Sequence, residues 1–144
     1  MLKKIFYSLL FSFLIYFNFS SPVLAKDYSF PQVKFKVQVN KDGSFEVQEQ
    51  RTYKFNGSFS WADLWIPFKN QNYKINNFQI RDESKIYKQN NSHLPATFYT
   101  EVSKDKLYAK WFYQASNQTK TFIIRYQDLN GIKLHSDIAE FYWK

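Results

Sequence analysis

Alternating apolar and polar residues predict an antiparallel hairpin around residue 42. Every second side chain of residues 32–40 is apolar: Val33, Phe35, Val37 and Val39. This period of two is typical of a half-buried strand whose opposite face meets solvent. Asp42-Gly43 follows, and Asp-Gly readily adopts the positive φ angles of a tight turn. The chain then returns through residues 44–55, so we expect the two strands to pair.

Polar turn clusters separate further segments with the length and composition of strands. These segments are residues 73–81, 97–102, 107–113 and 120–127. Pro67 lies in the aromatic segment 59–68, and a proline keeps such a segment out of the centre of a sheet. Residues 136–143 fit either a short helix capped by Ser136 or a last strand. The whole pattern predicts an all-β, antiparallel sandwich-like domain or an open barrel.

The return strand carries two charged residues on its apolar face. Glu49 and Arg51 have the same parity as its apolar residues (Phe45, Val47, Tyr53, Phe55). In a regular strand the two side chains would lie on the core side, about 7 Å apart. A charge is stable there only when it is paired. On the core side, Glu49 and Arg51 would therefore form an ion pair or a fixed polar site. A β-bulge near Glu49, or a strand end leaving the core, would turn both to solvent, and this is the arrangement we expect.

Residues 1–25 have the three-part pattern of a secretory signal. Lys3-Lys4 precede the apolar residues 5–19, and Val23-Leu24-Ala25 fits a signal-peptidase cleavage site. Fifteen helical residues span about 22 Å, less than the roughly 30 Å hydrocarbon core of a bilayer. An uncleaved membrane anchor is the alternative, and it leaves the domain on the same side. We therefore expect residues 26–144 to form a β-domain outside the cytoplasm, in the periplasm or at the cell surface.

The basic charge does not indicate a nucleic-acid site. The formal net charge is +8, but the lysines are scattered along the chain, whereas a polyanion site needs clustered basic residues. AT-rich codons specify Phe, Tyr, Ile, Asn and Lys together, which accounts for both the charge and the aromatic content of 22%. The chain has no cysteine, so core packing and sheet hydrogen bonds must stabilise an exported domain without disulfides.

The residue types present argue against an enzyme. Without cysteine there is no thiol nucleophile or zinc knuckle, and neither His93 nor His135 belongs to a metal-ligand pattern. The three glycines fall in turns, so none builds a phosphate-binding loop. Asp137 and Glu140 could converge, but nothing separates them from surface charge. We expect no catalytic residue, no metal and no cofactor, with both histidines in solvent.

Trp61 and Trp65 are the best candidates for a binding surface. An exposed tryptophan can stack on a sugar ring or anchor a partner protein, and the alternative is packing in the core. The two lie four residues apart in the segment limited by Pro67. Trp111 lies in an alternating stretch, and we expect it to be half buried.

Several motifs resemble one bacterial family. They are residues 40–57, with an Asp-Gly turn before a strand containing Glu49, then Ile66-Pro67, and residues 121–126 followed by Asp137, Glu140 and Trp143. This pattern is similar to domain of unknown function 2207 (YciQ-like), predicted membrane proteins, over roughly residues 28–144. Where family members often carry an arginine just before Ile-Pro, this chain has Leu64-Trp65.

The resemblance implies a β-rich domain outside the cytoplasm, usually followed by transmembrane helices, and no known activity. It also implies that Glu49 is structurally placed. This sequence stops at Lys144, before any such helix, which fits a truncated or split product or a short secreted variant. We expect a non-enzymatic interaction or sensing module of the cell envelope, or alternatively a glycan-binding module using Trp61 and Trp65. The expected partners are the membrane, through an uncleaved N-terminal segment, and envelope proteins or glycans, but not nucleic acid.

Overall fold

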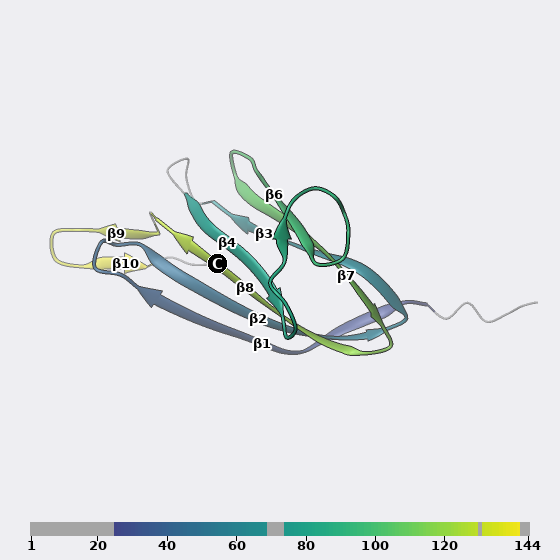
Figure 1. Cartoon of the computed structure of the whole chain (residues 1–144). Coiled ribbons are helices and arrows are strands. Elements are labelled where there is room, and N and C mark those ends of the chain that lie inside the picture. Colours follow the sequence, from purple (N-terminus) through teal and green to yellow (C-terminus); the bar gives the residue numbers. More distant parts are fainter. Residues whose placement is uncertain (1–24, 69–73, 130, 142–144) are drawn as a thin grey trace, which may run out of the picture.

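The computed structural model describes residues 25–68, 74–129 and 131–141, and in these ranges the chain forms strands and turns (Figure 1). The strands are β1 (Asp27–Val39), β2 (Phe45–Asn56), β3 (Ser58–Pro67), β4 (Ile75–Asp82), β5 (Lys88–Gln89), β6 (Thr97–Val102), β7 (Lys106–Ser116), β8 (Thr119–Asp128), β9 (Ile132–Leu134) and β10 (Ala139–Phe141). The all-β prediction is confirmed. The expected signal or anchor segment lies outside the described residues, apart from Ala25.

Two four-stranded sheets pack against each other. The first, called the β1 sheet, has the order β1-β2-β8-β4, and the second, the β3 sheet, has the order β3-β7-β6-β5. The short β5–β6 pair is parallel, and the other named pairs are antiparallel. A separate hairpin joins β9 to β10. The segment after Ser136 therefore ends in a strand, not in the alternative helix.

The first hairpin forms as its sequence predicts. β1 pairs with β2 from Asp27↔Asn56 to Val39↔Phe45. In the turn, Gly43 has a φ of +83°, and the Asp42 carboxylate accepts hydrogen bonds from the Ser44 hydroxyl at 2.7 Å and the Ser44 backbone N–H at 3.0 Å. These bonds lower the pKa of Asp42 and fix the turn that sets the register.

At one corner of the sandwich, neighbouring strands pass from one sheet to the other. Gly57, with a φ of +95°, is the single residue between β2 and β3. The side-chain oxygen of Asn117, between β7 and β8, accepts a hydrogen bond from the Gly57 backbone N–H at 2.7 Å. The Asn117 N–H in turn donates to the Gly57 carbonyl at 3.2 Å. The corner fixes where β2 and β3 diverge, and the groove described below opens beside it.

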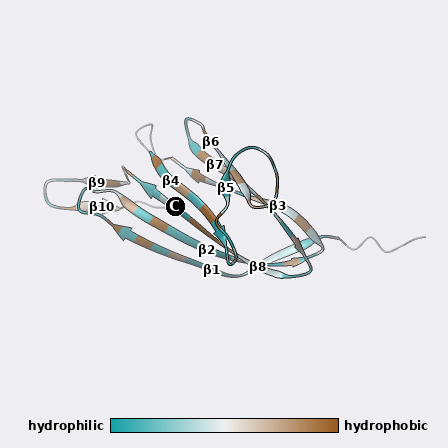
Figure 2. Ribbon diagram, viewed as in Figure 1, coloured by the Kyte–Doolittle hydropathy of each residue, from teal (hydrophilic) through white to brown (hydrophobic). Residues whose placement is uncertain are grey.

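The core lies between the two sheets and is dominated by aromatic side chains. The largest fully buried residues are Trp111, Phe45, Phe122, Ile80, Ile124 and Val47. Figure 2 shows hydrophobic and hydrophilic residues alternating along the long strands. The expectation that Trp111 is half buried is wrong, because it lies on the inward face of β7, a central strand, and has no exposed surface.

The two long sides of the sandwich differ. On one side, the chain crosses from β4 to β5, and two backbone hydrogen bonds hold this crossing. The Tyr87 N–H donates to the Ile80 carbonyl (2.9 Å), and the Asp82 N–H donates to the Lys85 carbonyl (3.0 Å). On the other side, β1 and β3 are edge strands. Pro67 belongs to β3, which agrees with the prediction that its segment is not central. The open side is where the inner surface of the sandwich reaches solvent.

Candidate binding groove

A groove opens between the edge strands β1 and β3. Its volume is about 620 Å³. Its walls come from the first residues of β1, the second half of β2 and most of β3, with one residue of β7. The side chains that line its interior include Tyr28, Phe30, Arg51, Tyr53, Phe55 and Phe59. A pocket of this size is typical of small-molecule sites.

Aromatic rings form a continuous wall along the groove. Phe30 lies 4.5 Å from Tyr53 between ring centroids, and Tyr28 packs edge-on against Phe59 at 5.9 Å. Phe55 connects the wall to the core, because its ring lies 4.9 Å from that of Phe59. Tyr28 and Phe30 are half exposed. They lie beside a shift in the β1–β2 register between Ser29 and Gln32. The irregularity of this strand pair is therefore in β1, at the groove, and not in β2 near Glu49.

Glu49 and Arg51 of β2 form an ion pair, and Arg51 lines the groove. The Arg51 Nε–H donates to the Glu49 carboxylate. The register of β2 with β8 is continuous from Phe45↔Asp128 to Lys54↔Thr119, so both charged side chains stay on the inward face. The Glu49 side chain is 5% exposed and that of Arg51 is 26% exposed. The expected bulge or strand end is therefore wrong, and the ion pair of a regular strand is present.

The pKa values of the groove show which groups carry charge. Burial lowers the pKa of Arg51, but the Glu49 carboxylate more than offsets this, so the pKa is raised overall. Burial raises the pKa of Tyr53 to about 12, with the Arg51 guanidinium opposing the rise. Burial also raises the pKa of Tyr113. Near neutral pH the Arg51 guanidinium is therefore charged and the phenols of Tyr53 and Tyr113 are neutral.

Trp61 and Trp65 lie on the outer face of β3, at the rim of the groove. Their cross-strand partners on β7 are Phe112 and Tyr108, and the intervening Leu64 is buried. Trp61 is 48% exposed and Trp65 is 64% exposed. The Lys110 ammonium lies 3.8 Å from the centre of the Trp61 ring. One face of Trp61 is therefore occupied, and Trp65 offers the more accessible ring.

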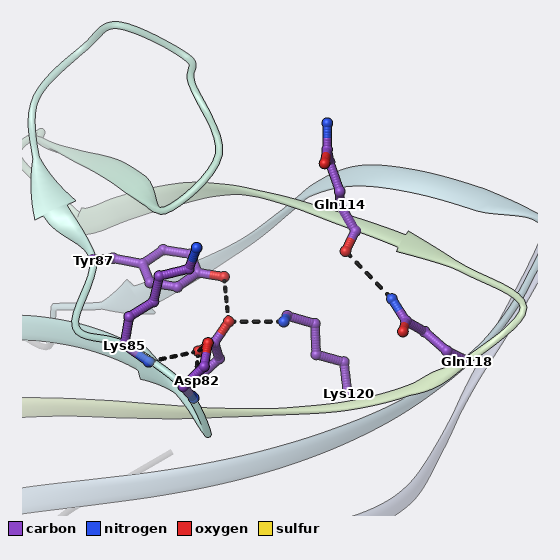
Figure 3. A network of polar contacts seen from close by, with 7 residues as sticks. Asp82, Lys85, Tyr87, Gln114, Gln118 and Lys120 are labelled. Carbon is purple, nitrogen blue, oxygen red and sulfur yellow. Dashed lines mark hydrogen bonds and ion pairs between the residues drawn. The ribbon is translucent and has the colours of Figure 1, made fainter.

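A second buried carboxylate lies on the closed side of the sandwich, and the sequence pattern did not single it out. Asp82, at the end of β4, contacts Lys120 on β8 at 2.7 Å and accepts a hydrogen bond from the Tyr87 hydroxyl at 3.1 Å (Figure 3). The Ser84 hydroxyl and two backbone N–H groups bind its other oxygen. The Asp-x-Ser spacing is a turn signal that could have indicated this site.

The network shifts the pKa values of both acids within it. Burial raises the pKa of Asp82, but the bonds from Lys120, Ser84 and Lys85 outweigh burial and bring the pKa well below its usual value. Burial and the Asp82 carboxylate raise the pKa of Tyr87. Asp82 thus stays ionised, with its charge satisfied by the fold itself. Its position away from the groove makes it a structural group.

The remaining candidates from the sequence do not come together. His93 is exposed and stacks on Phe112, with 4.7 Å between ring centroids. His135 lies 3.4 Å from Glu140, and both are exposed, as is Asp137. Among the described residues, no three His, Cys, Asp or Glu side chains are grouped as a metal site would require. Trp143 lies outside the described residues.

Residues 29–144 match the model of one protein family, described as "Predicted membrane protein (DUF2207) N-terminal domain". The match covers more than half of the chain. The chain belongs to this family. The DUF2207 match begins within β1 and continues past β10, so Glu49, Arg51, Trp61 and Trp65 all lie inside it. The resemblance seen in the sequence is confirmed.

Two further comparisons identified no relative of the chain beyond the DUF2207 family. A search of curated proteins and a search of solved structures each found no match. Within the described residues, no helix is long and apolar enough to span a bilayer. The family description associates the chain with a membrane protein, and the groove is the feature from which a role can be argued.

Proposed function

We propose that this domain acts outside the cytoplasm as a non-enzymatic interaction or sensing module of a membrane protein. The observation that carries the proposal is the groove of about 620 Å³ between β1 and β3. It combines partly exposed aromatic rings with a few charged groups, among them the guanidinium of Arg51. Such a mixture of apolar walls and a few placed polar groups is typical of binding sites.

The groups in the groove favour binding over catalysis. Arg51 is held by Glu49, and the neighbouring phenol of Tyr53 has a pKa of about 12. General acid–base catalysis works best with a group whose pKa lies near the operating pH. Neither the guanidinium nor this phenol changes its protonation near neutral pH. The groove therefore provides fixed donors and apolar surface, which suit recognition of a ligand.

The location proposal rests on the pattern of residues 1–25 and on the family. Lys3-Lys4, the apolar residues 5–19 and Ala25 fit a secretory signal or anchor. To test it, alkaline phosphatase and, separately, β-galactosidase are fused after Lys144 of the full chain in a bacterial host. We expect phosphatase activity and little galactosidase activity. The reverse result would place the domain in the cytoplasm and overturn this part of the proposal.

Photocrosslinking tests the groove as the site of interaction. Phe30 or Phe59 is replaced by benzoylphenylalanine in the full chain, and the cell envelope is irradiated. The same substitution at Gln79, which is exposed on the β1 sheet away from the groove, is the matched control. We expect adducts, detected by mass spectrometry, from the two groove positions only. Equal adducts from all three positions, or none at all, would rule out the groove.

Glycan binding is the second candidate, and the exposure of Trp61 and Trp65 supports it. The two rings are four positions apart along the strand, which places them about 13 Å apart on one face, and exposed tryptophans suit sugar stacking. Because Lys110 covers one face of Trp61, the Trp65→Ala variant should lose more binding on a glycan array than the Trp61→Ala variant. Ile86→Ala, at another exposed position, is the control. No binding by the unaltered chain, or unchanged binding by both tryptophan variants, would rule out glycan binding.

A further inference from the structure

We propose that the groove between β1 and β3 binds small organic acids that carry an aromatic or branched apolar body. The inference rests on the proposed function, because it names the ligand class of the same groove. Three features carry it: the aromatic walls, the accessible part of Arg51, and the placement of the two cations Lys26 and Arg51 in the groove.

The walls select the apolar part of the ligand. Tyr28 and Phe30 of β1 and Phe59 and Leu64 of β3 all line the groove, and Tyr28 contacts Phe59 edge-on. Tyr28 and Phe30 are 50% and 44% exposed, so a ligand body that lies against these two rings would remove apolar surface from water. Ring edges and faces of this kind favour flat or branched groups.

Arg51 selects the polar part. Its guanidinium has five N–H donors in a planar fork. The bond to Glu49 uses the one on Nε, and a further one is shared with the Tyr53 hydroxyl. The two terminal nitrogens extend beyond Nε. The Arg51 side chain is 26% exposed while that of Glu49 is 5% exposed, and of the two only Arg51 lines the groove. A ligand therefore meets the guanidinium, whose geometry matches a carboxylate.

The charge of the groove also favours an acid. Lys26 and Arg51 line it, and Glu49 behind Arg51 offsets one of these two positive charges. Asp63 lines the groove through its place in β3, but its carboxylate accepts a hydrogen bond from Tyr108 at 2.9 Å on the outer face. The four groups have no net charge, but Glu49 lies behind Arg51 and the Asp63 carboxylate is bonded on the outer face. A ligand in the groove therefore meets the cations Arg51 and Lys26 first. Such electrostatic complementarity provides specificity.

Three probes of the same size test the ligand class: 4-phenylbutyrate, 4-phenylbutanol and 4-phenylbutylamine. The full chain is produced in a bacterial host and recovered from the envelope, and binding is followed by tryptophan fluorescence, since Trp61 and Trp65 line the groove rim. We expect the acid to bind about tenfold more tightly than the alcohol, the factor that corresponds to about 1.4 kcal/mol. The amine should bind most weakly.

Variants assign the preference to the ion pair. Glu49→Gln should tighten binding of the acid, because it removes the carboxylate that competes for Arg51. The Glu49→Gln/Arg51→Gln double variant, which keeps a neutral polar pair, should bind acid and alcohol alike. Lys26→Gln, at an exposed residue where folding is not at risk, should weaken acid binding about twofold to threefold. Glu46→Gln and Arg81→Gln, both exposed and outside the groove, are charge-matched controls and should change nothing.

The outcomes separate this inference from the proposed function. Equal binding of acid and alcohol by the unaltered chain, or a preference that survives both the double variant and Lys26→Gln, overturns the acid class. If crosslinks from Phe30 and Phe59 persist in that case, the groove remains an interaction site. If those crosslinks are also absent, the proposed function fails as well.

Discussion

The closed side of the sandwich, at β4 and β5, and the open side, between β1 and β3, each bury a carboxylate beside a base, and they do so in different ways. Asp82 is bound by Lys120, Tyr87, Ser84 and two backbone N–H groups. Glu49 is paired with Arg51, whose side chain reaches the groove. The two bases are similarly exposed, 22% for Lys120 and 26% for Arg51. Asp82, however, is held by several further donors of the fold, whereas Arg51 lines the groove and can also serve a ligand.

An aromatic residue of the core and one of the open side should differ most in their contribution to stability. Phe122 is fully buried and Phe30 is 44% exposed. We expect Phe122→Ala to reduce the free energy of unfolding by about 3–5 kcal/mol, since it removes buried surface and leaves a cavity. Phe30→Ala should cost about 1 kcal/mol. Urea denaturation of both variants measures the contrast, and similar losses would mean that the groove is closed in solution.

Removing the carboxylate of Asp82 should have the next largest effect. Asp82→Ala leaves the ammonium of Lys120 and the hydroxyl of Tyr87 without their partner, so we expect a loss of about 3 kcal/mol or more. Urea denaturation is again the measurement. Glu83→Ala, at the exposed neighbouring residue, should change stability by less than about 0.5 kcal/mol. A loss below about 1 kcal/mol for Asp82→Ala would show that the network is solvated.

The ion pair of the open side should cost less to break. Glu49→Ala leaves Arg51, which can turn toward water in the groove, whereas Asp82→Ala also deprives Tyr87, Ser84 and two backbone N–H groups of their acceptor. We therefore expect a loss of about 2–3 kcal/mol. Glu46→Ala, on the outer face of the same strand, is the control. A loss under about 0.5 kcal/mol would mean that the Glu49–Arg51 pair is exposed.

Acid should weaken the closed side through Asp82. Its pKa is lowered in the folded state, so its contribution is complete above the unfolded-state pKa of about 3.9 and is lost as the pH falls toward the folded-state pKa. In that window the free energy of unfolding should fall by up to about 1.4 kcal/mol per pH unit. Asp82→Asn should flatten this dependence between pH 4 and pH 2, as followed by circular dichroism. An unchanged slope would assign the acid sensitivity to other carboxylates.

The smallest effect is expected at the rim. Trp65 is 64% exposed, so Trp65→Ala should change the free energy of unfolding by less than about 0.5 kcal/mol. Ligand binding by the Trp65→Ala variant should change if the rim of the groove takes part in recognition. Thermal unfolding checks the first point, and a loss of several degrees would show that this ring packs on the fold.

Much of the fold followed from local patterns. The β1–β2 hairpin, its Asp42-Gly43 turn and the later strands were predictable because side-chain alternation and turn residues are local properties. β5 and β9 were missed, since strands of two and three residues carry too little pattern. The candidate site was only partly predictable. The sequence singled out Glu49, Arg51, Trp61 and Trp65, but it gave no sign that β1 contributes Tyr28 and Phe30 to the same groove.

By itself, the sequence determined the strand class, the turns, the family and the parity that gives Glu49 and Arg51 one face. Tertiary structure decided which side of the sandwich stays open, and therefore that Arg51 reaches a groove while Asp82 is enclosed. It also decided that Trp111 is fully buried and Trp65 is exposed. Strand parity assigns a side chain to one of two faces, but the burial of that face depends on which strands of the opposite sheet cover it. Residues far apart in the chain set that coverage.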